Sequence, residues 1–198
     1  MRISLILLIV FLIAGCTQKK VGAKAYLKYI ADDGNGLIKS KEIDGMIVEV
    51  KYLTPEAMAL NEIQDLSVNK QRFDKVLSEY KGFDYFNIAI RAKKERHIYE
   101  LLNSEGISEQ PLEEYLNYKA QPDLYLVTGG DTAKCTLYSY SQTYALAKQF
   151  DIATGFVNID SSGANNKVLE FNATMFNRGL MKFVFDRNDI NNVPALAL

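Results

Sequence analysis

Residues 37–56 read LIKSKEIDGMIVEVKYLTPE, and this stretch carries the clearest structural signals of the chain. Two apolar segments, 37–43 and 46–53, flank an Asp-Gly pair, which is a strong signal for a β-hairpin. Apolar and polar residues alternate in the second segment, which predicts a strand with one buried face. The Thr-Pro-Glu sequence at 54–56 then predicts the start of a helix, with Thr as its N-cap. A hairpin followed directly by a helix indicates mixed α and β structure.

The same signals recur along the rest of the chain. Apolar residues at helical spacing predict helices after residue 54, over 69–80 and from 108 to 118, whereas 25–30 fits either a helix or a strand. Alternation and turn residues predict further strands at 83–91, 123–128, 133–140, 151–159, 167–173 and 180–186. Strands, then helices, then more strands favour an α+β fold over alternating βαβ units. We therefore expect an antiparallel, β-rich α+β domain with two or three helices in the middle of the chain.

Composition excludes several classes of function. The 198 residues include 23 Lys and Arg against 24 Asp and Glu, so no excess of positive charge favours nucleic acid as a partner. One His and two Cys are too few for a closed zinc site or a framework of disulfides. The length suits one compact domain, or at most two small ones. No motif indicates a cofactor, and we expect none.

The N-terminus indicates where the protein resides. Arg2 precedes an apolar run at 3–13, which is too short to span a bilayer comfortably but has the length of the hydrophobic region in a secretory signal. The run ends in Ile-Ala-Gly-Cys at 13–16, and polar residues follow. This quartet resembles the lipobox of bacterial lipoproteins, in which the Cys thiol receives diacylglycerol, the peptide is cleaved before the Cys, and the new amine is acylated.

The resemblance implies how the chain is processed and where it is anchored. Residues 1–15 would be a cleaved signal peptide, 16–24 the lipidated Cys16 with a short polar tether, and 25–198 a single folded domain. Several acyl chains anchor a protein durably in a bilayer, whereas one binds only marginally. Thr17 replaces the Asp that retains many lipoproteins in the inner membrane, so we expect the outer membrane of a diderm bacterium.

No arrangement of residues points to catalysis. Cys135 lies in an alternating segment that places it on the same face as Leu137, as a buried and inert thiol. A hydrolase would need Cys135 beside His97, the single histidine. We therefore expect a non-catalytic envelope protein that binds a protein partner or serves in assembly. The alternative is a lipoprotein that captures a glycan or peptide on a platform made by four tyrosines, Tyr125, Tyr138, Tyr140 and Tyr144.

Two short motifs have a functional and a purely structural interpretation. Asp33, Asn35 and Glu42 match positions of an EF-hand calcium loop, but Ala31 occupies the first ligand position and a strand follows instead of a helix. A polar turn that leads into the hairpin accounts for these residues better. Thr132, within Asp-Thr-Ala, resembles the short acceptor pattern for O-glycosylation in envelope proteins of some anaerobic bacteria. The same residues fit a hairpin turn equally well.

Replacing Cys16 with Ser should release the protein from the membrane, because the hydroxyl cannot accept the thioether-linked diacylglycerol. After cell fractionation, the wild-type chain should be found with the membranes. The Cys16→Ser variant should carry no lipid and should be found outside the membrane fraction. Intact-mass measurement of the wild-type protein should show an N-terminal acylated Cys. An unmodified thiol at this position would exclude a lipobox.

Overall fold

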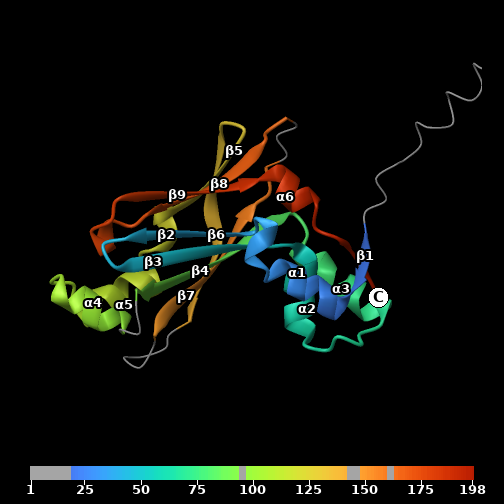
Figure 1. Cartoon of the computed structure of the whole chain (residues 1–198), viewed down its shortest axis with the longest axis horizontal. Coiled ribbons are helices and arrows are strands. Elements are labelled where there is room, and N and C mark those ends of the chain that lie inside the picture. Colours follow the sequence, from blue (N-terminus) through green and yellow to red (C-terminus); the bar gives the residue numbers. More distant parts are fainter. Residues whose placement is uncertain (1–18, 94–96, 142–147, 160–162) are drawn as a thin grey trace, which may run out of the picture.

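The computed structural model describes residues 19–93, 97–141, 148–159 and 163–198. These residues form an antiparallel eight-stranded sheet with helices gathered at its two ends (Figure 1), which confirms the expected α+β class. The strands of this sheet are β2 (Ile38–Ile43), β3 (Met46–Leu53), β4 (Phe83–Ala92), β5 (Leu124–Thr128), β6 (Asp131–Ser141), β7 (Gln149–Val157), β8 (Asn166–Asn172) and β9 (Leu180–Asp186).

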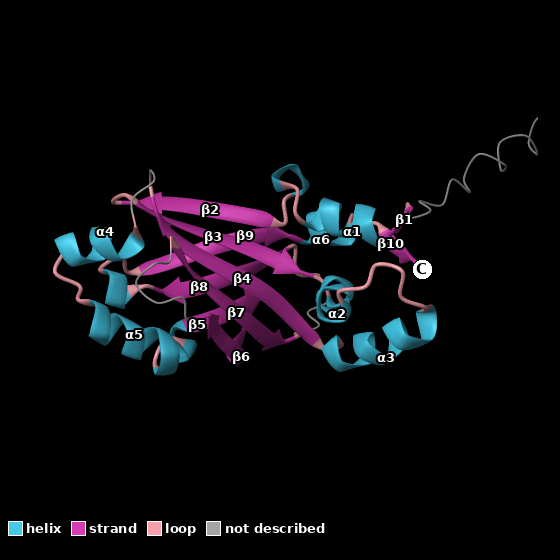
Figure 2. Ribbon diagram, turned by 90° about the horizontal axis from the view of Figure 1, so that it is seen from below, coloured by secondary structure: helices cyan, strands magenta, loops and turns pink. Residues whose placement is uncertain are grey.

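The helices cover opposite ends of the sheet. Figure 2 shows α4 and α5 at one end and α1, α2 and α3 at the other. Their bounds are α1 (Ala23–Ile30), α2 (Pro55–Ile63), α3 (Lys70–Tyr80), α4 (Ile98–Ser104), α5 (Glu109–Tyr118) and α6 (Arg187–Asn191), and the short 3-10 helices are η2 (Asp33–Asn35), η3 (Gln121–Asp123) and η5 (Thr174–Phe176). The segment at 25–30, which fitted either a helix or a strand, therefore belongs to helix α1.

The sheet curls until its two edge strands approach each other. Its strand order is β2-β3-β4-β7-β6-β5-β8-β9, so β2 and β9 are the edges. The Lys41 Nζ of β2 lies 5.9 Å from the centroid of the Phe183 ring of β9. Along the uninterrupted strands, alternate residues face the enclosed interior, as the periodicity of a strand requires. The largest buried side chains there are those of Phe86, Phe150, Phe156, Phe171, Phe183 and Phe185.

The hairpin at residues 38–53 forms as the sequence predicts. Ile43 pairs with Met46, so Asp44 and Gly45 form a two-residue turn with φ of 48° and 78°. Positive φ at both positions is the backbone that a tight hairpin needs and that Asp-Gly adopts readily. The predicted N-cap also forms, since the Thr54 hydroxyl accepts a hydrogen bond from an amide in the first turn of α2.

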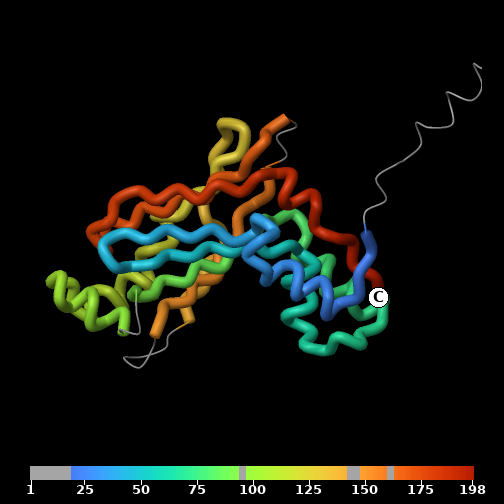
Figure 3. The backbone as a smooth tube through the Cα atoms, in the orientation of Figure 1, coloured from blue at the N-terminus to red at the C-terminus, as the bar shows by residue number. Residues whose placement is uncertain are grey.

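The two ends of the described chain meet in a small parallel ribbon, beside the C-terminus marked in Figure 3. Strand β1 (Lys20–Gly22) pairs with β10 (Ala195–Ala197). Residues 20–24, which were expected to belong to the tether, lie instead in β1 and the first turn of α1, so the folded domain begins before residue 25. Among the described residues, no helix combines the length and the apolar character that crossing a bilayer requires.

A buried ion pair crosses the interior of the curled sheet. The Lys167 ammonium of β8 lies 2.6 Å from an Asp84 carboxylate oxygen of β4, and their side chains are 5% and 0% exposed. The Tyr52 hydroxyl donates to the other Asp84 oxygen at 3.1 Å. Burial, together with the Asp84 charge, raises the Tyr52 pKa well above its usual value, so this hydroxyl remains a donor. The three residues join β3, β4 and β8 from inside.

Removing either charge of this pair should destabilise the fold, because the other charge stays buried without compensation. Asp84→Asn and Lys167→Met should each lower the free energy of unfolding by about 3–5 kcal/mol, and the double variant by less than their sum. Urea unfolding measures these values. Lys182→Met is the matched control, since the ion pair of Lys182 with Glu170 is more exposed and its loss should cost about 1 kcal/mol or less. If the loss of unfolding free energy in the double variant equalled the sum of the losses in the two single variants, the two residues would not be a coupled pair.

Candidate functional site

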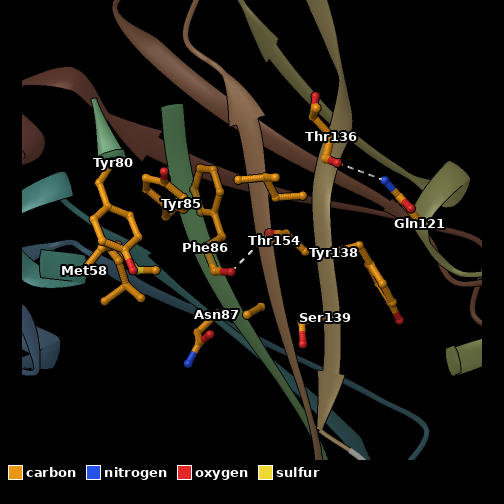
Figure 4. Close-up of a pocket in the computed structure, with 13 residues that line it drawn as sticks. Met58, Tyr80, Tyr85, Phe86, Asn87, Gln121, Thr136, Tyr138, Ser139 and Thr154 are labelled. Atoms are coloured by element: carbon orange, nitrogen blue, oxygen red, sulfur yellow. Dashed lines mark hydrogen bonds between the residues drawn. The ribbon is translucent and has the colours of Figure 1, made fainter. Parts of the chain in front are cut away.

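A groove runs along the outer face of the sheet over β7. The small residue Ala153 of β7 forms part of its floor between larger neighbours on β4 and β6, whereas Gly155, which also points outward, is covered by Leu137. The strand register places Gly155 between Tyr85 and Leu137 in one cross-strand row. In the next row Ala153 lies between Asn87 and Ser139. Figure 4 shows the groove with Tyr80 and Met58 on one side and Thr136 and Gln121 on the other.

A β-bulge in β6 shapes one wall of the groove. The pairing of β6 with β7 shifts between Cys135 and Leu137, so that the two residues face opposite sides of the sheet. Cys135 is buried, whereas Leu137 is 45% exposed. The expectation that they share a face is therefore wrong, because simple alternation does not anticipate an inserted residue. A Cβ atom at Gly155 would lie 2.9 Å from the Leu137 Cδ1, so glycine allows Leu137 to lean over β7.

The opposite wall is aromatic. The rings of Tyr80, at the end of α3, and Tyr85, on β4, meet edge to face with their centroids 5.6 Å apart. The Tyr80 hydroxyl donates to a Glu62 carboxylate oxygen at 2.5 Å, which ties α3 to α2. This hydrogen bond and burial raise the pKa of Tyr80 to about 12, so its hydroxyl is protonated at neutral pH. The wall is thus a fixed, uncharged aromatic surface.

The lining determines what the groove can do. Its volume is about 410 Å³, within the range of roughly 300–1,000 Å³ that is usual for ligand sites. None of the described residues that line it carries a charge. Its polar groups are amides and hydroxyls, such as those of Asn87 and Ser139, and the Gln121 amide already donates to the Cys135 carbonyl at 3.0 Å. The groove is therefore suited to holding an uncharged, mainly apolar group rather than to acid–base chemistry.

The structure does not bring Cys135 and His97 together. Cys135 pairs with Phe156, which in turn pairs with Asp84 near the start of β4. His97 follows the other end of β4, after Ala92. The eight residues from Asp84 to Ala92 span about 26 Å of strand. The His97 Nδ1 is itself buried and has no hydrogen-bond partner among the described residues. This geometry does not supply the thiol–imidazole pair that a hydrolase would need.

The four tyrosines expected to form a binding platform are placed differently from one another. Tyr138 and Tyr140 are half-buried against α5, where the Tyr138 hydroxyl donates to the Leu116 carbonyl at 2.6 Å and the Tyr140 hydroxyl to Glu113 at 3.0 Å. Tyr125 is half-buried on β5. Tyr144 lies outside the described residues. The hydroxyls of Tyr138 and Tyr140 therefore join the sheet to α5.

The residues of the calcium-loop motif do not converge. Asp33 and Asn35 lie in η2, where the Asn35 amide donates to the Tyr29 carbonyl at 3.0 Å. Glu42 lies further along β2 and forms an ion pair with Lys93 at 2.7 Å. Glu42 follows Asn35 by seven positions, most of them in the extended strand β2, which carries Glu42 away from η2. Among the described residues, no group of three or more His, Cys, Asp or Glu side chains is arranged to hold a metal ion.

The candidate glycosylation site occupies an exposed position. Thr132 is the second residue of β6, directly after the tight turn at Gly129 and Gly130. Its side chain is accessible on the hairpin, as an acceptor hydroxyl must be. The O-glycosylation of Thr132 stays a prediction, since accessibility alone does not distinguish it from a turn residue.

Sequence reasoning missed the residues that make the groove. Gly155 and Ala153 look like ordinary small residues of a strand, and Leu137 looks like a core residue. The one local signal was the spacing of Ala153 and Gly155, which puts two small side chains on the same face of β7. Comparison with models of known protein families, with curated proteins and with solved structures gave no match.

The thiol of Cys135 should be unreactive in the folded protein. Burial raises its pKa to about 11, so at pH 8 only about a thousandth of it is thiolate, the form that alkylating agents attack. Iodoacetamide should label the Cys135 peptide slowly in native protein and rapidly after unfolding in urea, as mass spectrometry of the digest can measure. Rapid native labelling at neutral pH would contradict an inert, buried thiol.

Proposed function

We propose that the chain is a lipid-anchored protein of the bacterial envelope that binds a partner protein through the groove over β7, in a non-catalytic, assembly-type role. The Ile-Ala-Gly-Cys sequence at 13–16 supports the anchor, with lipid on Cys16. The absence of Asp after Cys16 supports the outer membrane. The observation that carries the binding role is the apolar, uncharged groove itself.

A protein segment fits this groove better than a charged metabolite does. The floor at Ala153 carries only a methyl group, which leaves room for an apolar side chain of a partner. A charged ligand would lose hydration there without gaining a counter-ion. Asn87 and Ser139 flank Ala153 and offer hydrogen-bonding groups to a partner backbone. Exposed apolar surface framed by polar residues is characteristic of protein interaction sites.

The glycan-capturing alternative rests on exposed aromatic rings. Stacking on a sugar requires a free ring face, and the expected rings of Tyr138 and Tyr140 are half-buried against α5. Their hydroxyls are already bonded within the protein. Tyr138 also contributes to the lining of the groove, but its neighbour Leu137 is 45% exposed there and is available to a partner. The positions of these tyrosines therefore favour protein binding over glycan capture.

A photo-crosslinking residue in place of Ser139 should capture one defined envelope protein in intact cells. Ser139 is exposed beside the groove, so a segment seated on Ala153 would lie within reach. Adding Ala153→Glu should abolish the adduct, because a charged side chain would fill the floor. Immunoblotting and mass spectrometry of the adduct provide the measurement.

The same crosslinker at Val184 is the matched control. Val184 is 47% exposed, close to the 45% of Leu137, but it lies on the outer face of β9. It should give no adduct with the same partner. If Ser139 yields no adduct in wild-type cells, or if the Ala153→Glu variant keeps the adduct at full yield while remaining folded by circular dichroism, the groove is not the binding site.

A further inference from the structure

The end of the molecule that carries β1 is positively charged. Residues 19–31 contain four lysines and no acidic residue, whereas the whole chain carries a formal charge of −1. All four side chains are exposed. Two belong to β1 or directly precede it, and two lie one helical turn apart on the exposed side of α1. We call this group the N-terminal lysine patch: Lys19, Lys20, Lys24 and Lys28.

We infer that the N-terminal lysine patch binds the anionic headgroups of the phospholipid bilayer to which the chain is anchored. This inference rests on the lipid anchor proposed above. The four residues from Cys16 to Lys20 span at most about 14 Å. That distance is comparable to the roughly 10 Å over which charges interact at moderate salt. Chain length and charge therefore both direct the patch to the lipid surface that holds it.

The fold presents this patch on a rigid surface. Helix α1 is fixed at its start by the ribbon of β1 with β10, and Tyr26 anchors its inner face through a 2.6 Å hydrogen bond between its hydroxyl and that of Thr54. Lys24 and Lys28 point away from this buried face. The nearest acidic residues in sequence, Asp32 and Asp33, follow the far end of the helix. Helix α1 therefore carries only positive charge along its own length, while Asp74 of α3 lines a depression together with Lys20.

The proposed anchor, rather than charge alone, favours lipid over other acidic partners. Nucleic acid and acidic proteins would also attract lysines, but the anchor brings the bilayer next to the patch permanently and at high local concentration. Each lysine near an anionic membrane surface raises the surface-bound population by about fivefold. The patch would hold the domain in one orientation on the membrane, with α1 against the headgroups.

The test uses the full lipidated protein in vesicles, with a fluorophore on α1. Ala25→Cys places an exposed thiol between Lys24 and Lys28, while Cys135 is buried and Cys16 carries the lipid. Vesicles are made of phosphatidylcholine alone or of phosphatidylcholine with phosphatidylglycerol, each with a headgroup energy acceptor. Energy transfer should be several-fold stronger on the anionic vesicles and should fall towards the neutral value when salt is added.

Charge reversal on α1 should remove this difference. Lys24→Glu with Lys28→Glu should lower the transfer on anionic vesicles to the level on neutral ones, whereas Lys134→Glu with Lys148→Glu, which changes the net charge equally on exposed residues elsewhere, should preserve it. Lys19 and Lys20 stay unchanged so that lipid processing is unaffected. Flotation of the vesicles in a density gradient shows whether the protein is anchored to them. If the protein floats with both vesicle types but energy transfer is equal on both, the inference is overturned and the anchor is not. If the protein floats with neither vesicle type, the anchor is overturned as well.

Discussion

The ion pair between Asp84 and Lys167 is the constraint on which the curled sheet depends. These residues lie 83 positions apart in the sequence and on strands separated by three others in the sheet, yet their charged atoms meet at 2.6 Å in the interior. Neither charge can be buried alone without a large cost, so the pair forms only when β4 and β8 face each other across the core. An apolar core by itself would tolerate many arrangements of these strands.

The same arrangement of strands also produces the groove on the outer face of the sheet. Asp84 pairs in register with Phe156, and Phe156 with Cys135, so one cross-strand row of the sheet is fixed from inside. The adjacent row is one residue away on β4 and β7 and, because of the bulge, two residues away on β6. This row points outward and contains Gly155 and Leu137. A residue inserted in β6 thus turns what would be a core leucine into a wall of the groove.

Local structure could be predicted from the sequence, whereas the site could not. The Asp-Gly hairpin and the Thr54 cap depend on residues a few positions apart, and both are found where expected. The groove depends on which strands become neighbours. Strand β7 pairs with β4, although α4, α5, η3, β5 and β6 lie between them among the described elements of the chain, and no local periodicity encodes that pairing. The bulge after Cys135 is equally invisible, because alternation assigns faces only to uninterrupted strands.

The placement of α3 links the anchored end to the groove. Its first residue, Lys70, lines a shallow depression with Lys20 of β1 and with Leu198, while its last residue, Tyr80, forms part of the groove wall. Eleven helical residues extend about 16 Å. If Cys16 carries lipid, the near end of the groove therefore lies within a few nanometres of the bilayer. A partner that fills the groove must then itself reach the membrane surface, which favours another anchored or membrane-embedded envelope protein over a freely diffusing one.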